Sequence, residues 1–142
     1  MFEATPQFSL VTDRGRYDLW VPAKGLVLQR LVGHGDAELM RTMTRELDKA
    51  LAEASPISIF DDFEELEGYD SEGRLHLMAW TKENWAELRM VHILVRSRVV
   101  ATGLSVANVA FGGAIRSHTE RPRFEAAFKL ELEQATVAPR KT

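Results

Sequence analysis

The stretch from Ile57 to Gly73, ISIFDDFEELEGYDSEG, decides how the chain folds. The short apolar run from Ile57 to Phe60 is typical of a buried central strand. An acidic segment that reads as a loop follows this run, and the residues from Asp70 to Gly73 lead into a helical pattern. This order of strand, loop and helix start is typical of α/β folds, which place function at the ends of their strands. The functional site is therefore expected here.

The residues before this stretch predict a sheet followed by a helix. Two strands, Phe8 to Thr12 and Tyr17 to Val21, flank a short turn that contains Gly15, which favours a hairpin. A third strand is predicted from Leu26 to Val32, and Asp36 can cap the helix that follows. The apolar positions of this helix are Leu39, Met40, Met43, Leu47, Ala50, Leu51 and Ala54.

The remainder of the chain alternates between helical and strand patterns. A second helical region covers Leu75 to Leu88, and Thr81 leaves open a restart that would divide it into two shorter helices. Val91 to Val95 is a further apolar strand, and Val99 to Ala110 suits either a strand or a helix. Pro122 suits the first turn of a terminal helix. The apolar stripe of that helix consists of Phe124, Ala127, Phe128 and Leu132.

The order of these elements predicts an α/β fold, in which helices pack on a mixed β-sheet. A length of 142 residues without an interdomain linker suits one domain over residues 1–142. Its core is expected over about residues 8–134. The polar tail at residues 137–142 is expected to fray.

Composition excludes several classes of function. The absence of cysteine rules out a disulfide framework, a thiolate metal site and a thiol nucleophile, and it fits a reducing compartment, so the cytoplasm is the expected location. No apolar run approaches the length that spans a bilayer, so membrane insertion is not expected. A net charge of -3 gives no general attraction to nucleic acid.

The polar residues predict neither a metal site nor a catalytic centre. The four histidines are His34, His76, His92 and His118. They lack the spacing of metal ligands, and Ser71 lacks the surroundings of a nucleophile elbow. An enzyme that uses Asp61, Asp62 or His76 ranks last, because no two of these residues have a reason to converge. We therefore expect no catalytic residue, no metal and no cofactor.

The segment around Ser71 resembles the signature of STAS domains, the anti-sigma factor antagonist family. In that family an apolar strand leads to an Asp-Ser-Ser-Gly or Asp-Ser-x-Gly turn, which opens a helix and carries the phosphoacceptor. Asp70-Ser71-Glu72-Gly73 has this form, with Glu72 in place of the common second serine. Leu26 to Val32, followed by Gly33 and Asp36, resembles the strand-Gly-x-x-Asp-helix start of the family. The resemblance spans about Phe8 to Gln134.

This resemblance implies a STAS-like fold and a non-enzymatic signalling or protein-interaction module, with Ser71 as the candidate phosphoacceptor. It implies an anti-sigma factor or a kinase-like regulator as the partner, and ATP would be used by that partner. Independently of the family, Asp70 or Ser71 could simply cap the helix, a role worth about 1 kcal/mol. The predicted partner-binding residues are Asp61, Asp62, Glu64, Glu65, Asp70, Ser71, Glu72 and Gly73.

Two further hypotheses stay open at this point. A small molecule or lipid could bind in a pocket between the sheet and the Leu75 to Leu88 region, where Trp80 and Trp85 cannot share one face of a continuous helix. A homodimer could form through an exposed edge strand of the opening hairpin. The apolar residues that support the pocket are Leu77, Met78, Trp80, Trp85 and the segment from Val99 to Phe111.

Overall fold

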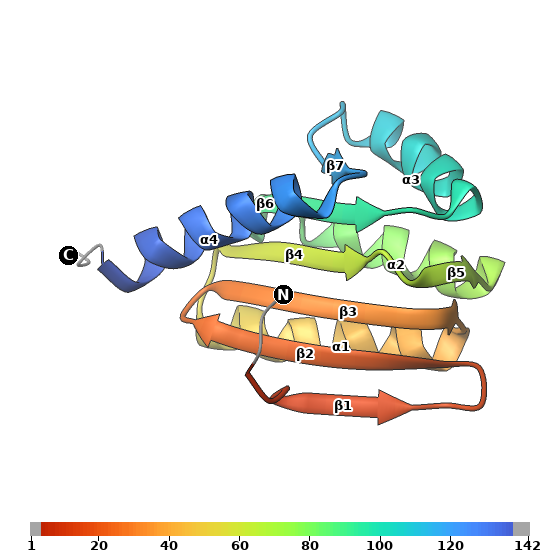
Figure 1. The fold of residues 1–142 in the computed structure, drawn as a ribbon, viewed down its shortest axis with the longest axis horizontal. Coiled ribbons are helices and arrows are strands. Elements are labelled where there is room, and N and C mark those ends of the chain that lie inside the picture. The colour runs from red at the N-terminus through yellow and green to blue at the C-terminus, as the bar shows by residue number, and fades with distance from the viewer. Residues whose placement is uncertain (1–3, 138–142) are drawn as a thin grey trace.

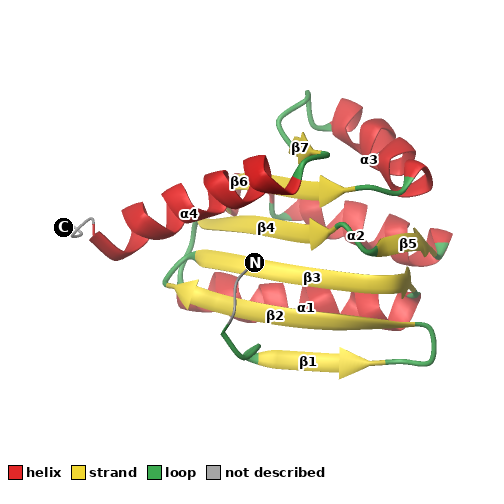
Figure 2. Ribbon diagram, in the orientation of Figure 1, coloured by secondary structure: helices red, strands yellow, loops and turns green. Residues whose placement is uncertain are grey.

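A mixed sheet forms the middle layer of the molecule (Figures 1 and 2). The computed structural model describes residues 4–137. The strands of this part are β1 (Phe8–Val11), β2 (Gly15–Ala23), β3 (Leu26–Gly35), β4 (Ile57–Phe63), β5 (Leu66–Tyr69), β6 (Leu88–Val95) and β7 (Arg116–His118). Their order in the sheet is β1-β2-β3-β4-β6-β7, and β5 pairs with β3. The first two pairings are antiparallel and the others parallel, which confirms the predicted mixed sheet.

Helices cover both faces of the sheet. They are α1 (Ala37–Glu53), α2 (Ser71–Glu83), α3 (Arg98–Ala110) and α4 (Arg121–Val137), with a short 3-10 turn at Trp85–Glu87. Figure 1 shows α1 and α2 behind the sheet and α4 across its front. Val100 of α3 belongs to the same apolar cluster as residues of α1, so α3 packs on the face that α1 covers. No helix within residues 4–137 is both long enough and apolar enough to cross a bilayer.

Strand β4 is buried along its whole length because parallel strands flank it and helices cover both of its faces. Its side chains alternate: Ile57 and Ile59 pack with α1, whereas Phe60 packs with α4. The strand continues through Asp61 and Asp62 to Phe63. The prediction that a loop begins after Phe60 is therefore wrong, and the reason lies in the partners of the two carboxylates described below.

Several boundaries differ from the predicted ones. Strand β3 continues beyond Val32 to Gly35, because β5 pairs with its far end. Neither β5 nor β7 was expected, since four and three residues carry too little pattern. The ambiguous segment from Val99 is helix α3, whose Ser97 hydroxyl accepts a hydrogen bond from the Val100 amide. Helix α2 does not restart at Thr81.

The principal helix follows the predicted pattern, and the two tryptophans lie on different elements, Trp80 on α2 and Trp85 in the 3-10 turn. Asp36 caps α1 by accepting a hydrogen bond from the Leu39 amide at 2.9 Å, as expected. Trp80 is buried and donates its indole N–H to Asp48 at 2.7 Å, whereas the half-buried Trp85 stacks on Phe111. Helix α4 ends at residue 137, so the rest of the polar tail lies outside the described residues.

Candidate functional site

Ser71 is the first residue of α2 and is exposed. Among residues 4–137, no hydrogen-bond partner is found for its hydroxyl. Asp70 occupies the N-cap position, yet its carboxylate makes no capping hydrogen bond to α2. The simple capping role that the sequence left open for these two residues is thus not the one they have.

The Asp70 carboxylate instead connects the start of α2 to two other parts of the sheet. His34 at the end of β3 donates from Nε2 to Asp70 Oδ1 at 2.7 Å, and Arg14 of the β1–β2 turn lies 3.5 Å from the same oxygen. The hydrogen bond from His34 lowers the pKa of Asp70 below its ordinary value, with further contributions from the Ala37 amide and Arg14. Asp70 is therefore ionised near neutral pH and ties the start of α2 to His34 and Arg14.

Gly73 is buried where α1 and α2 approach each other. A Cβ atom at this position would lie 2.8 Å from Met40 Cγ and 3.4 Å from Ala37 Cα. The fourth position of the Asp-Ser-x-Gly turn therefore serves helix packing. Because it is buried, Gly73 does not belong to the surface predicted to bind a partner.

An open groove of about 520 Å³ lies beside Ser71, between the start of α2 and α3. Arg74 and Arg98 line it, and among the described residues neither makes an ion pair. Two exposed valines of α3, Val99 and Val106, supply apolar surface in the same groove. The arrangement suits an anionic group bound next to an apolar contact.

Comparison with known proteins identifies the architecture. No family model and no curated protein matches the chain in sequence. The solved structure of the Bacillus cell fate determinant SpoIIAA in its phosphorylated form aligns with a TM-score of 0.57 and 18% identity, over 78% of this chain and 98% of SpoIIAA. The anti-sigma factor antagonist SpoIIAA in its unphosphorylated form aligns with a TM-score of 0.58 and 18% identity, over 81% and 97% of the two chains. The chain has the STAS fold.

The remaining predicted contact residues differ in how exposed they are in this STAS fold. Glu65 is exposed in the turn between β4 and β5, and Glu64 in the same turn is half-buried beside Arg121. Glu72 is exposed on α2 and pairs with Arg41 at 3.3 Å. The acidic residues that remain accessible are therefore at the β4–β5 turn and at the start of α2.

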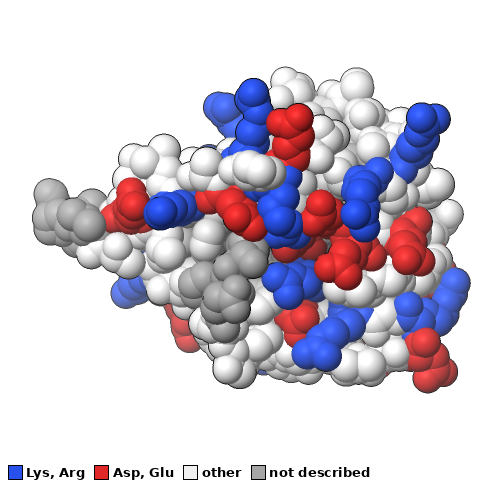
Figure 3. Space-filling view, viewed as in Figure 1, with Lys and Arg blue, Asp and Glu red and all other residues white. Residues whose placement is uncertain are grey.

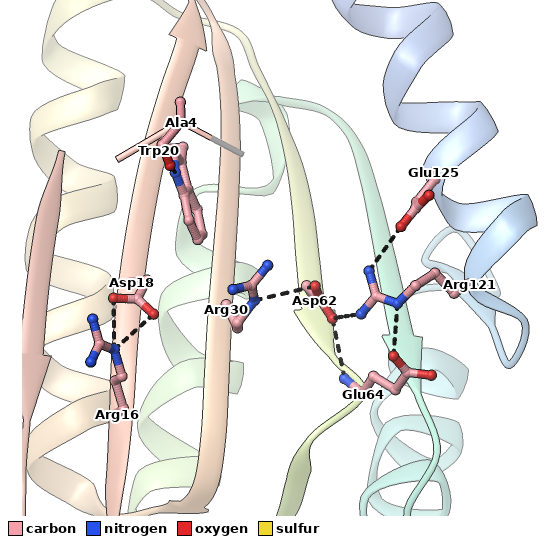
Figure 4. A network of polar contacts seen from close by, with 9 residues as sticks. All are labelled: Ala4, Arg16, Asp18, Trp20, Arg30, Asp62, Glu64, Arg121 and Glu125. Carbon is pink, nitrogen blue, oxygen red and sulfur yellow. Dashed lines mark hydrogen bonds and ion pairs between the residues drawn. The ribbon is translucent and has the colours of Figure 1, made fainter. Parts of the chain in front are cut away.

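Asp62 is buried on the α4 face of the STAS sheet and is neutralised there. Arg30 of β3 lies 3.4 Å from one carboxylate oxygen, and Arg121 of α4 lies 2.8 Å from the other. Figure 4 shows both guanidinium groups directed toward Asp62, and Arg121 also reaching Glu64 and Glu125. Figure 3 shows acidic and basic side chains intermixed over this face. Asp62 joins α4 to the sheet and is not a surface contact.

Asp61 is buried on the opposite face, toward α1 and α2. Gln29 of β3 donates from Nε2 to Asp61 Oδ1 at 2.7 Å, and Tyr17 donates its hydroxyl to Gln29 Oε1 at 2.7 Å. Burial raises the pKa of Asp61 to about 7, although the hydrogen bond from Gln29 opposes the shift and the charge of Asp62 adds to it. The prediction that Asp61 and Asp62 belong to an accessible partner surface is therefore corrected.

Replacing Arg121 by methionine is expected to lower the free energy of unfolding by about 2 kcal/mol, because Asp62 is 2% exposed and would keep only Arg30. Urea denaturation at neutral pH measures the change. Arg123→Met is the matched control, since Arg123 is 81% exposed and its ion pair with Glu120 should contribute almost nothing. Equal effects of the two substitutions would contradict the role of Arg121.

The STAS sheet also brings together residues that the sequence did not connect. His92 Nδ1 and His118 Nε2 lie 2.9 Å apart, with Phe60 stacked on His92 and Phe124 against His118. Burial lowers the pKa of both imidazoles, that of His92 to about 4, so the pair is neutral at pH 7. Within residues 4–137 no three histidine or carboxylate side chains gather as they would around a metal ion.

A cavity of about 110 Å³ lies where the sequence suggested a pocket, between the sheet, α2 and α3. Leu77 and Met78 of α2 and Leu104 of α3 line it, and Trp85 does not. Asp61 contributes a carboxylate to the otherwise mostly apolar lining. Tyr69 and Arg74 line both this cavity and the groove beside Ser71, so the two hollows are neighbours.

Proposed function

We propose that this chain is a non-enzymatic STAS signalling module that binds a protein partner in the cytoplasm, and that phosphorylation of Ser71 controls the binding. The observation that supports it is the exposed Ser71 hydroxyl at the start of α2, which makes no hydrogen bond among the described residues. A hydroxyl with no structural task is free to accept a phosphoryl group. SpoIIAA, which has the same fold, has been solved in phosphorylated and unphosphorylated forms.

The surroundings of Ser71 favour an electrostatic switch over a change of fold. A phosphoryl group would add about 1.5 to 2 negative charges at a helix N-terminus, where the helix dipole stabilises an anion. Arg74 and Arg98 lie in the adjoining groove and have no ion pair in the described part of the chain. A phosphate on Ser71 would form ion pairs with these two guanidinium groups. The groove would then change from cationic to nearly neutral.

The partner surface we propose consists of the groove and the accessible acidic residues of the β4–β5 turn and of the start of α2. An unmodified groove presents the arginines together with Val99 and Val106, which suits an acidic partner surface with an apolar anchor. An anti-sigma factor or a kinase-like regulator is the class of partner, and the partner would supply the ATP. The accessible acidic members of the surface are Glu65, Asp70 and Glu72.

Ser71→Asp is expected to weaken the complex with the co-purified partner at least about tenfold, equivalent to about 1.4 kcal/mol, because it places a negative charge beside the arginines. Ser71→Ala should retain the partner and should abolish a mass increase of one phosphoryl group in chain purified from its native host. Intact-mass analysis and a pull-down with tagged chain measure the two effects.

Ser105 provides the matched control, because it is exposed on α3 and does not line the groove. Ser105→Asp and Ser105→Ala should leave both the retained partner and the phosphorylated mass unchanged. The proposal fails if intact-mass analysis finds the same number of phosphoryl groups on wild-type chain and on Ser71→Ala. It also fails if Ser71→Asp binds the partner as tightly as wild type does.

A further inference from the structure

The cavity under α2 and α3 has mostly apolar walls and one carboxylate among the described residues, that of Asp61. Leu77, Leu104 and Ile93 are among the residues that form its walls, and Asp61 reaches it from β4. Asp61 is 6% exposed, and among residues 4–137 it forms no ion pair. Its sheet neighbour Asp62, by contrast, is held by two arginines. A buried carboxylate without a cation is costly unless a hydrogen-bond donor satisfies it.

The hydrogen bonds of Asp61 leave one of its oxygens available to the cavity. Tyr17 donates to Gln29, and Gln29 donates to Asp61 Oδ1, so this relay orients the carboxyl group. Burial raises the pKa of Tyr17, which therefore stays a donor. No donor to Oδ2 is found in the described part of the chain.

The other acidic groups near Asp61 have basic partners of their own: Lys49 lies 3.0 Å from Glu46, and Arg30 and Arg121 pair with Asp62. Glu46 of α1 is 8% exposed, and its charge and that of Asp61 help to raise the pKa of Tyr17. The charge of Asp62, on the opposite face of β4, helps to raise the pKa of Asp61. Arg74 of α2 lines the cavity as its basic group, on the side shared with the groove beside Ser71. A cationic donor placed at Asp61 would meet an apolar wall and a carboxylate that is unpaired within the described part of the chain.

We propose that this cavity binds a small apolar amine, whose ammonium group donates to Asp61 Oδ2 while its hydrocarbon part lies between α2 and α3. The volume of about 110 Å³ is smaller than that of an engineered protein cavity of about 150 Å³ that accommodates benzene, so one ring is the upper limit for the hydrocarbon part. Part of such a ring would extend toward the neighbouring groove, with which the cavity shares Tyr69 and Arg74. This inference does not depend on phosphorylation of Ser71, because the serine does not line the cavity.

Benzylamine is the probe, and toluene is its control without the amine. Isothermal titration of the full chain at about pH 8 is expected to show benzylamine binding at least about tenfold tighter than toluene. Asp61→Asn should reduce the affinity for benzylamine to the affinity for toluene. Affinity for benzylamine, but not for toluene, should rise between about pH 6 and 8 as Asp61 ionises, because burial raises its pKa to about 7.

Two variants in which an alanine is replaced by tryptophan test where the compounds bind. Ala107→Trp should fill the cavity and abolish binding of both compounds, whereas Ala52→Trp on the exposed face of α1 should change neither. Leu104→Phe repeats the cavity-filling test if Ala107→Trp does not fold. The proposal is overturned by an absence of saturable benzylamine binding, by equal affinities for benzylamine and toluene, or by full binding in Asp61→Asn. Binding that persists in Ser71→Ala separates this site from the proposed switch.

Discussion

Asp61→Asn is expected to raise the free energy of unfolding at about pH 8 by about 2 to 4 kcal/mol, because the buried carboxylate must ionise in the native state there. Burial raises the native-state pKa of Asp61 from 3.8 to about 7. At a pH below both values Asp61 is protonated in the native and the unfolded state and does not lower the free energy of unfolding. As the pH rises toward 7 only the unfolded chain loses the proton, so stability falls, and above about 7 the full penalty is present.

Asparagine removes this penalty and preserves the local geometry. Its side-chain oxygen can still accept the hydrogen bond from Gln29 that Asp61 Oδ1 accepts at 2.7 Å. Urea denaturation between about pH 4 and 8 should therefore give a decline for wild type that is much reduced in Asp61→Asn. Asp13→Asn in the exposed β1–β2 turn is the control and should follow wild type. A variant with the same decline as wild type would show that Asp61 is not the group responsible.

Phe124→Ala is expected to lower the free energy of unfolding by about 3 to 5 kcal/mol, the range for a large buried aromatic residue replaced by alanine. Phe124 is completely buried where α4 meets the sheet. Its ring contacts Phe60 of β4 and His118 edge-on, with centroids 5.8 Å apart in both cases. Because two aromatic neighbours lose a partner, the cavity left behind should collapse only partly.

Leu130→Ala is the matched control, since Leu130 is on the same helix but 55% exposed. Its effect should stay within about 0.5 kcal/mol. Chemical denaturation followed by circular dichroism compares the two variants. A loss below about 1 kcal/mol for Phe124→Ala would mean that α4 contributes little to the stability of the sheet.

Long periodic segments of the chain were predictable because their pattern is local. The apolar positions of α1 and its cap Asp36 stand within one stretch of sequence, and both were found as expected. The turn from Asp70 to Gly73 likewise predicted the start of α2 and, through its likeness to STAS domains, the fold. Strand β7 was missed because three residues carry no measurable period.

The acidic part of the stretch from Ile57 to Gly73 was wrongly predicted to be a loop, because a run of charged residues usually indicates a solvated loop. Asp61 and Asp62 are inside a strand because Gln29 and Arg30, their neighbours on β3, satisfy them. Arg121, which lies far away in the sequence, completes the neutralisation of Asp62. No pattern within the stretch could reveal these partners.

Three features could be predicted before folding is considered: the α/β class, the helix start at Ser71 and the apolar residues of the pocket. They depend on residues close together in the chain. The folded arrangement was needed to show which acids are buried, that Ser71 rather than Asp61 or Gly73 is accessible, and that a carboxylate faces the cavity. Burial and charge pairing depend on which strands and helices become neighbours. In this fold those neighbours come from β2, β3, α1 and α4.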